Sequence, residues 1–469
     1  MKQESFLNQY PNLSLAASMA ALLRERYCGE HGLLVQKVDT SQGKILNPRP
    51  IIDELGDYVQ YTLVLGNLIG DEGLCAWSKA QVMTALKISQ SDVGFIHSLA
   101  IQPGLRGCFH RTIYFQLATC DTLWGLVECF RLWPDPTLRT RIERFVEGVL
   151  RFGTGKKHLP VYGVFRWHGI SLPLPLSNPM LVGYWIESLI MLYEILKNDQ
   201  YLTAATEMAY ALVKGAGFQG SGFFPLRIGT HFLDETLHPL FDLVLRWRGR
   251  LPSAGSIMVK GNVYFIFGLL ALYRMTSESW IREAIIRWKR CVLERLRTLD
   301  GRFYNHWYGI NRPPKVISLG TNHSFIELFL DIFYDMRDEE ALQMACQTAR
   351  AWLTKRSKIG LIPDGDYTPI AFLDPHIDFT INLMKLWQIT GDPFWRETTE
   401  EMERAVEKYY HQPFGLAWEL DTETGKIVHS EIETKFLGLF LKLPLLLYFA
   451  THKGELMSDA NLRKLATDR

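Results

Sequence analysis

The chain has 469 residues, of which 47% are hydrophobic and 12% aromatic, so it can bury a large core. Its 51 basic and 50 acidic residues leave a formal net charge of +1, which argues against nucleic acid or an anionic membrane as a partner. The seven cysteines are odd in number and form no CxxC pair, which argues against a disulfide framework or a structural zinc site.

The N-terminal segment is expected to form an amphipathic helix from about Leu13 to Tyr27. It lacks the basic flank and the uninterrupted apolar core of a secretory signal. The most apolar segment, from Phe436 to Ala450, is short for a membrane span and is interrupted by Lys442 and Pro444. We therefore expect a buried helix there, no membrane insertion, and a soluble, cytoplasmic protein.

Short joints recur along the chain where an apolar helix pattern gives way to a more polar one. They lie at Asp71, Asp135, Asp199, Ser277, Asp338 and Asp392. Successive joints are 64, 64, 78, 61 and 54 residues apart, a spacing too regular to ignore and too loose for a strict solenoid. The short Asp or Ser side chain is expected to accept a hydrogen bond from the N–H groups that open the next helix.

Two kinds of helix alternate strictly through these joints. The more polar helices are predicted to begin near residues 13, 71, 136, 199, 278, 338 and 392, and the apolar ones near 53, 110, 178, 260, 322, 375 and 431. This alternation predicts two layers, with the apolar helices inside and the others outside. No Gly/Ser linker or low-complexity tract marks a boundary, so we expect one domain over residues 1–469.

The connections that lead into the apolar helices are long and rich in Gly, Pro and aromatic residues. Several contain short alternating runs with turn residues, which predict small β-hairpins. The connection at residues 218–259 is long enough for a further short helix near Leu233 to Trp247. Long loops gathered on one rim would place the mouth of a pocket at the N-terminal ends of the apolar helices.

This architecture resembles the α/α-barrel superfamily of carbohydrate-active proteins, which includes six-hairpin glycosidases and N-acylglucosamine 2-epimerases. The resemblance covers nearly the whole chain and implies an all-α, two-layer (α/α)6 or (α/α)7 barrel with short β-hairpin loops on one rim. It rests on architecture, without a diagnostic catalytic motif of any one family. It implies a small-molecule or oligosaccharide substrate.

The run Glu433-Thr434-Lys435 and the apolar segment after it are similar to the end of the class I α-mannosidase family, a calcium-dependent seven-hairpin barrel. The other motifs of that family are absent, so its calcium and its catalytic residues are not carried over. The sequence also has no Gly-rich phosphate loop, no HExxH motif and no GxSxG elbow. We expect no cofactor, and the metal requirement stays open.

Ionisable residues gather where the apolar helices are predicted to begin. A charge that faces an apolar interior must be paired, hydrated or neutralised, so such a cluster predicts a wet, polar cavity that suits sugar hydroxyls. The best-supported group is Asp374, His376 and Asp378 with Glu431 and Glu433, at the starts of consecutive apolar helices. Asp378 lies one turn inside its helix, where helix capping no longer explains it.

Three functions fit this pattern. The catalytic candidates are Asp57, His323, His376, Asp378, Glu431 and Glu433. Two carboxylates from neighbouring helices could act as general acid and base across a glycosidic bond, which predicts a glycoside hydrolase. Histidine bases, drawn from His323, His376 and His429, would instead suit a sugar epimerase or a uronate-acting lyase. A helical toroid that binds a peptide or an isoprenoid without catalysis is the third alternative.

Polar and aromatic residues of the loops are candidates for substrate contacts. They are Glu54, Arg106, Arg166, His168, His306, Trp307, Asp374 and His429. Arg166 would suit a carboxylate or a phosphate group.

Each candidate also has a purely structural interpretation. Asp53, Asp374 and Ser430 are plausible helix caps, and Glu431 or Glu433 would suit a helix dipole. The pair Glu54 and Asp57 fits an exposed surface equally well, His323 and Glu327 share one helix face, and the aromatic loops could pack on themselves.

Overall fold

A computed structural model of the chain describes residues 7, 10–50, 52, 55–97, 113–116, 120–155, 158–167, 170–174, 176–226, 228–229, 257–307 and 316–452. The further helix predicted near residues 233–247 lies outside these ranges. The chain divides into two compact units. Unit 1 takes residues 1–90, 128–140 and 345–469, and unit 2 takes residues 91–127 and 141–344. The division falls within helices α6 (Cys120–Leu132), α7 (Pro136–Phe152) and α15 (Glu339–Leu353).

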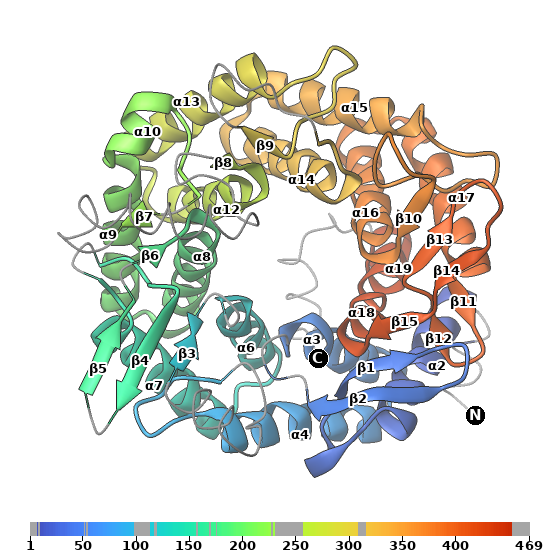
Figure 1. Cartoon of the computed structure of the whole chain (residues 1–469), viewed down its shortest axis with the longest axis horizontal. Helices are drawn as coiled ribbons and strands as arrows, with labels where there is room; N and C mark the ends of the chain where they lie inside the picture. Colours follow the sequence, from blue (N-terminus) through green and yellow to red (C-terminus); the bar gives the residue numbers. More distant parts are fainter. Residues whose placement is uncertain are drawn as a thin grey trace, which may run out of the picture. The chain divides into compact units, whose positions relative to one another are not determined.

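Unit 1 contains two layers of helices. The apolar layer is α3 (Gly56–Ile69), α16 (Leu373–Thr390), α18 (Thr434–Leu439) and α19 (Lys442–His452), which contact one another. The more polar layer is α2 (Pro11–Arg26), α4 (Glu72–Ser89) and α17 (Pro393–Tyr410), which packs against the first (Figure 1). The apolar helix predicted from residue 431 begins instead as a strand, because residues 431–433 pair with a strand near the N-terminus. The helical part that follows is divided into α18 and α19.

Unit 2 repeats this arrangement. The apolar helices α8 (Pro179–Leu196), α12 (Val259–Thr276) and α14 (Leu319–Met336) lie side by side, and the outer helices α9 (Asp199–Val213) and α13 (Ser279–Arg295) pack on them. The short helix α10 (Ala216–Ser221) follows α9.

Glycine sets the close approach of α8 and α12. A Cβ atom on Gly183 would lie 2.3 Å from the carbonyl oxygen of Tyr264, so no larger residue fits there. The rings of Tyr184 and Tyr264 stack beside this contact, with their centroids 4.8 Å apart.

The helix joints follow the sequence prediction at four of six positions. Asp71, Asp135, Asp338 and Asp392 each accept a hydrogen bond from a backbone N–H two or three residues further on. At the third joint the cap is Asn198 instead of Asp199. Ser277 has a left-handed φ of 55° and ends α12, so its hydroxyl is not the cap of α13.

Short antiparallel strands occupy the long connections of unit 1, as predicted. One sheet has the order β15 (Glu431–Glu433), β1 (Val35–Asp39), β2 (Lys44–Pro50), and a second has the order β10 (Ile370–Phe372), β13 (Glu419–Asp421), β14 (Ile427–His429). Strands β11 (His411–Gln412) and β12 (Gly415–Leu416) form a third pair. β10 leads directly into α16 and β15 into α18, so these sheets lie at the N-terminal ends of apolar helices.

Unit 2 has three small antiparallel sheets. They are β3 (Ile113–Phe115) with β4 (Gly163–Trp167) and β5 (Ile170–Pro173), β6 (Leu176–Ser177) with β7 (Ile228–Gly229), and β8 (Ile257–Met258) with β9 (His306–Trp307). Each of the strands β6 and β8 directly precedes an apolar helix.

The first and last segments of the chain pack together in unit 1. Strand β1 pairs with β15 in the register Val38 to Ile432, and the Thr434 hydroxyl donates to the carbonyl oxygen of Val35. The Tyr27 hydroxyl donates to the carbonyl of Phe414 at 2.5 Å. Strand pairing and side-chain hydrogen bonds therefore join segments from the two halves of the sequence in unit 1.

Two segments have the length and hydropathy of a membrane span, Pro179–Leu196 and Thr434–His452. Of their residues, 61% and 67% are buried within the structure. This burial is what core helices of a folded domain show, as expected for the segment after Phe436.

Candidate active site

A polar row runs along the apolar helix α16. Asp374, Asp378 and Asn382 are spaced four residues apart and therefore lie on one face. The carboxylate of Asp378 lies 3.5 Å from Nζ of Lys442, at the start of α19, and the two side chains are only 19% and 13% exposed. Both side chains have little contact with water, so loss of either partner would leave an unpaired charge that is costly.

A second carboxylate and lysine lie where β15 passes into α18. The carboxylate of Glu433 is 3.4 Å from Nζ of Lys435, whose side chain is 14% exposed and lies over the ring of Phe436. Glu433 occupies the N-cap position but makes no side-chain capping bond. Because α16 contacts both α18 and α19, we treat Asp378, Lys442, Glu433 and Lys435 as one group, the acid–lysine cluster.

Glu431 has a different environment from Glu433. Its carboxylate lies 2.6 Å from Nζ of Lys37 on β1, and both side chains are about half exposed. Surface pairs of this kind contribute about 0–1 kcal/mol to stability. Glu431 thus makes a tight ion pair that ties β15 to β1.

His376 is fully buried and bonded through both ring nitrogens. Nε2 accepts the N–H of Ile362 at 2.9 Å, and Nδ1 lies 3.0 Å from the carbonyl oxygen of Phe372, so Nδ1 carries the proton. Burial lowers the pKa of His376 to about 4, opposed by the bond to Phe372. Both nitrogens are used by the backbone of the fold, and neither is directed to a substrate.

Two asparagines, at the equivalent positions of other apolar helices, also accept a loop N–H, and they donate to the carbonyl of the same loop residue as well. Asn262 accepts the N–H of Phe224 and donates to its carbonyl, both at 2.8 Å. Asn322 does the same with Phe303, at 2.8 and 2.9 Å. Each of the three side chains also bonds the carbonyl four residues earlier, which belongs to the N-cap residue of its helix. We call this contact the loop clamp, and His376 is its third instance.

Several candidates lie in unit 2. His323 is 4% exposed on α14, directly after the clamp residue Asn322. Burial lowers the pKa of His306 on β9. Trp307 packs on Phe223, with ring centroids 5.4 Å apart. Arg166 on β4 already holds Asp92, with 2.8 Å between the guanidinium and the carboxylate.

The remaining candidates are distributed as follows. Glu54, Arg106 and His168, like Asp53, lie outside the described residues, and Asp57 is described only as a backbone position of α3. Asp374 is in the first turn of α16, and His429 on β14 is 58% exposed and 3.6 Å from Glu419. In unit 1, Asp374 and Asp378 lie on α16, and Glu433 directly precedes α18, a helix that contacts α16.

The two lysines of the cluster were not among the predicted site residues. The signal for them was present, because Lys435 directly precedes the apolar run and Lys442 interrupts it, and a buried ammonium requires a carboxylate partner. Among the described residues, no group of three or more His, Cys, Asp and Glu side chains is placed to hold a metal ion.

No family model matches the sequence, and no curated protein sequence matches it. Solved structures do match. The α-1,2-mannosidase from Trichoderma reesei superposes with a TM-score of 0.63 at 12% identity, over 94% of each chain. The protein is an α/α barrel.

Two further solved structures agree with this assignment. The cellobiose 2-epimerase from Bacillus thermoamylovorans B4167 has a TM-score of 0.55 at 14% identity and covers 76% of this chain and 95% of its own. A D-mannose isomerase has a TM-score of 0.56 at 10% identity and covers 94% of this chain and 97% of its own. The predicted all-α, two-layer barrel is confirmed, and at these identities the likeness concerns the fold.

Proposed function

We propose that this α/α barrel is a carbohydrate-active enzyme, and specifically a glycoside hydrolase that uses Asp378 and Glu433. The observation that carries the proposal is the acid–lysine cluster. Asp378, Lys442 and Lys435 are 13–19% exposed and Glu433 is 41% exposed, and charges with so little contact with water are costly and are kept where function requires them. The fold likeness to an α-1,2-mannosidase supports the same class of reaction.

The carboxylates would divide the reaction between them. One, as an acid, would donate a proton to the glycosidic oxygen as the bond to the leaving sugar breaks. The other would take a proton from the attacking water, or form and release a covalent glycosyl intermediate. Lys442 and Lys435 would position the carboxylates. The nitrogen–oxygen distances in these two pairs, 3.5 and 3.4 Å, are longer than the 2.6 Å of the Glu431–Lys37 pair. A substrate hydroxyl would therefore lose less ion-pair energy by coming between the charges.

Substitution of the two carboxylates tests this assignment. We expect Asp378→Asn and Glu433→Gln each to lower kcat by about 10²–10⁴-fold, the usual contribution of an acid or base group. Glu431→Gln is the matched control, since it removes a carboxylate from the same strand and leaves the cluster intact. Turnover is measured as sugar release from mannobiose and a panel of aryl glycosides. Near-normal turnover in both cluster variants would refute the assigned roles.

A sugar epimerase or isomerase is the second candidate. It is favoured by the likeness to a cellobiose 2-epimerase and a D-mannose isomerase, each matched over nearly its whole length. His323 in unit 2 or His429 in unit 1 would then supply a base, because both nitrogens of His376 are already used. Running the same reactions in D2O separates the two candidates, since hydrolysis leaves carbon-bound hydrogen in place and epimerisation labels the recovered sugar with deuterium.

A binding protein without catalysis is the third candidate. It is favoured by the fact that Asp378, Glu433 and Glu431 each have a lysine partner. The same assays decide it, because such a protein would turn over no glycoside and would label no sugar.

A further inference from the structure

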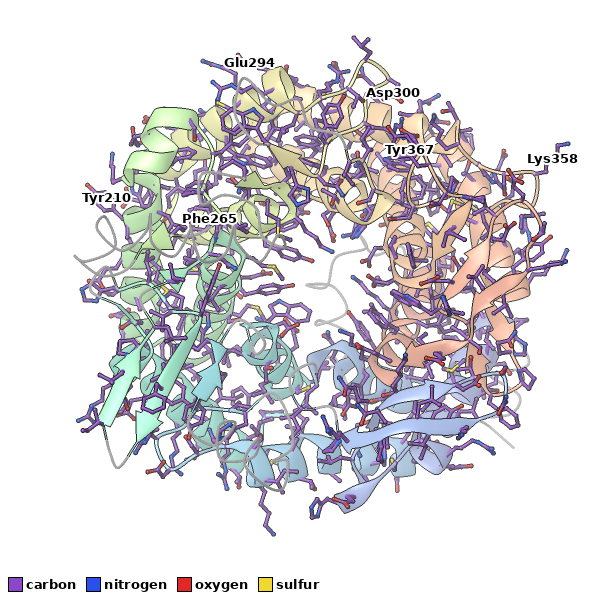
Figure 2. The ribbon with its side chains drawn as sticks, in the orientation of Figure 1. Tyr210, Phe265, Glu294, Asp300, Lys358 and Tyr367 are labelled. Carbon is purple, nitrogen blue, oxygen red and sulfur yellow. The ribbon has the colours of Figure 1, made fainter. Side chains whose placement is uncertain are left out.

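Unit 1 has a surface groove that shares no residue with the acid–lysine cluster. Its volume is about 720 Å³. It is lined by residues 355–358 after α15, by Pro363 and residues 365–369 before β10, and by Thr422 and Glu423 in the turn between β13 and β14. Figure 2 shows two of its side chains, Lys358 and Tyr367.

The walls of the groove are held by hydrogen bonds of the fold. The guanidinium of Arg356 bonds the carboxylate of Glu401 at 2.6 Å and the carbonyl of Gly360 at 3.2 Å. On the opposite wall, the backbone N–H of Thr422 and its hydroxyl both donate to the carbonyl of Pro369, at 2.7 and 3.0 Å. The groove is therefore formed before any ligand arrives, which lowers the entropic cost of binding.

The charges in the groove compensate one another. Lys355 is 3.3 Å from Asp366, and Arg356 is held by Glu401. Lys358 and Glu423 remain, and neither makes an ion pair with the part of the chain that the structure describes. One donor and one acceptor of opposite charge suit hydroxyl groups, whereas an anion would meet the carboxylate of Glu423 and a cation the ammonium of Lys358.

The groove lining also includes the aromatic ring of Tyr367. Tyr367 is 88% exposed, although an aromatic side chain normally buries most of its surface. Its ring can pack against the C–H face of a sugar while Lys358 and Glu423 bond the hydroxyls. Pockets that bind small ligands combine apolar surface and a few placed polar groups in this way.

We propose that this groove is a second carbohydrate site, which binds a neutral oligosaccharide through Tyr367, Lys358 and Glu423. The inference takes the class of ligand from the proposed function, and it places that ligand on residues that take no part in the proposed reaction. A longer chain bound here would be held on the enzyme by contacts other than those to its reacting bond.

Calorimetric titration with mannotetraose and with cellotetraose tests the proposal. We expect at least one of them to bind the Asp378→Asn protein, in which the proposed hydrolysis is blocked, and Tyr367→Ala in that background to weaken binding about tenfold. Tyr334→Ala is the matched control, because Tyr334 is 53% exposed on α14 in unit 2. Glu423→Gln is expected to weaken binding about threefold through the loss of a charged acceptor.

The outcomes separate the groove from the proposed reaction. Weaker binding in Tyr367→Ala with unchanged binding in Tyr334→Ala supports the groove, whether or not the protein hydrolyses any glycoside. Unchanged affinity in Tyr367→Ala would overturn it, as would equal losses in both tyrosine variants or no binding of either sugar by the unmodified protein. Because Tyr367 is so exposed, its truncation is not expected to impair folding.

Discussion

At the scale of single residues, Glu403 shows how burial changes an acid. It lies in α17 with 8% exposure, and Asn12 of α2 donates to its carboxyl group at 2.5 Å. Burial, reinforced by the charges of Glu407 and Glu400, raises the pKa of Glu403 from 4.5 to about 8. Glu403 is therefore mostly protonated at neutral pH in the folded protein.

This shift predicts a pH-dependent stability. The folded state holds the proton of Glu403 more tightly than the unfolded state, so the stabilisation is complete below pH 4.5 and is lost as pH rises through about 8. In urea denaturation at pH 5, 7 and 9, Glu403→Gln should flatten this fall in the free energy of unfolding, an effect on the order of a few kcal/mol. Glu401→Gln on the same helix is the control. Parallel pH profiles for the unmodified protein and Glu403→Gln would contradict the shift.

Candidate site residues could be predicted from the sequence where the chain departs from its local pattern. Asp378 stands out because a carboxylate one turn inside an apolar helix has no capping role, and the structure places it beside Lys442. The sequence alone could not show that His376 is structural. A histidine at the start of a helix gives the same pattern whether its ring binds a substrate or a backbone group. The distinction lies in the loop that reaches Nε2, which is fixed by tertiary structure.

At the scale of elements, the loop clamp explains how the long loops are fixed to the apolar helices. In each instance a glycine with positive φ lies two residues before the loop residue that the clamp bonds. These glycines are Gly222, Gly301 and Gly360. The glycine turns the chain so that a buried N–H meets a side chain from the helix. A clamp made twice by Asn and once by His indicates a structural role for His376.

Substitution at the clamp distinguishes structure from catalysis. We expect Asn322→Ala and His376→Ala each to lower the free energy of unfolding by about 1–3 kcal/mol, because buried backbone groups lose their partners. His376→Asn should recover part of that loss and retain near-normal kcat. Chemical denaturation and turnover are measured on the same preparations. A folded His376→Asn protein with turnover reduced a hundredfold or more would show that the imidazole takes part in the reaction.

At the scale of the whole molecule, the alternation of helices was the most predictable feature. Six of the seven more polar helices begin within one residue of the predicted positions, because the pattern is summed over many residues. The start of α6 at Cys120 and the strand at residues 431–433 were missed. The strand forms because it pairs with β1, which is separated from it by nearly the whole length of the sequence. The residues around 431–433 cannot indicate such a distant partner.

The joining of the chain ends gives the last prediction. Thr434 is fully buried at the start of α18, and its hydroxyl donates to the carbonyl of Val35 on β1. Thr434→Val keeps the shape of the side chain but removes the donor, so the free energy of unfolding should fall by about 1–3 kcal/mol.

Thr434→Ser is the matched control for this contact. It keeps the donor and loses only a methyl group, which costs about 1 kcal/mol. Urea denaturation of both variants separates the hydrogen bond from the packing. If the hydroxyl helps to hold the last apolar helices to the first strand, Thr434→Val should lose more free energy of unfolding than Thr434→Ser. A larger loss in Thr434→Ser would mean that packing alone makes this connection.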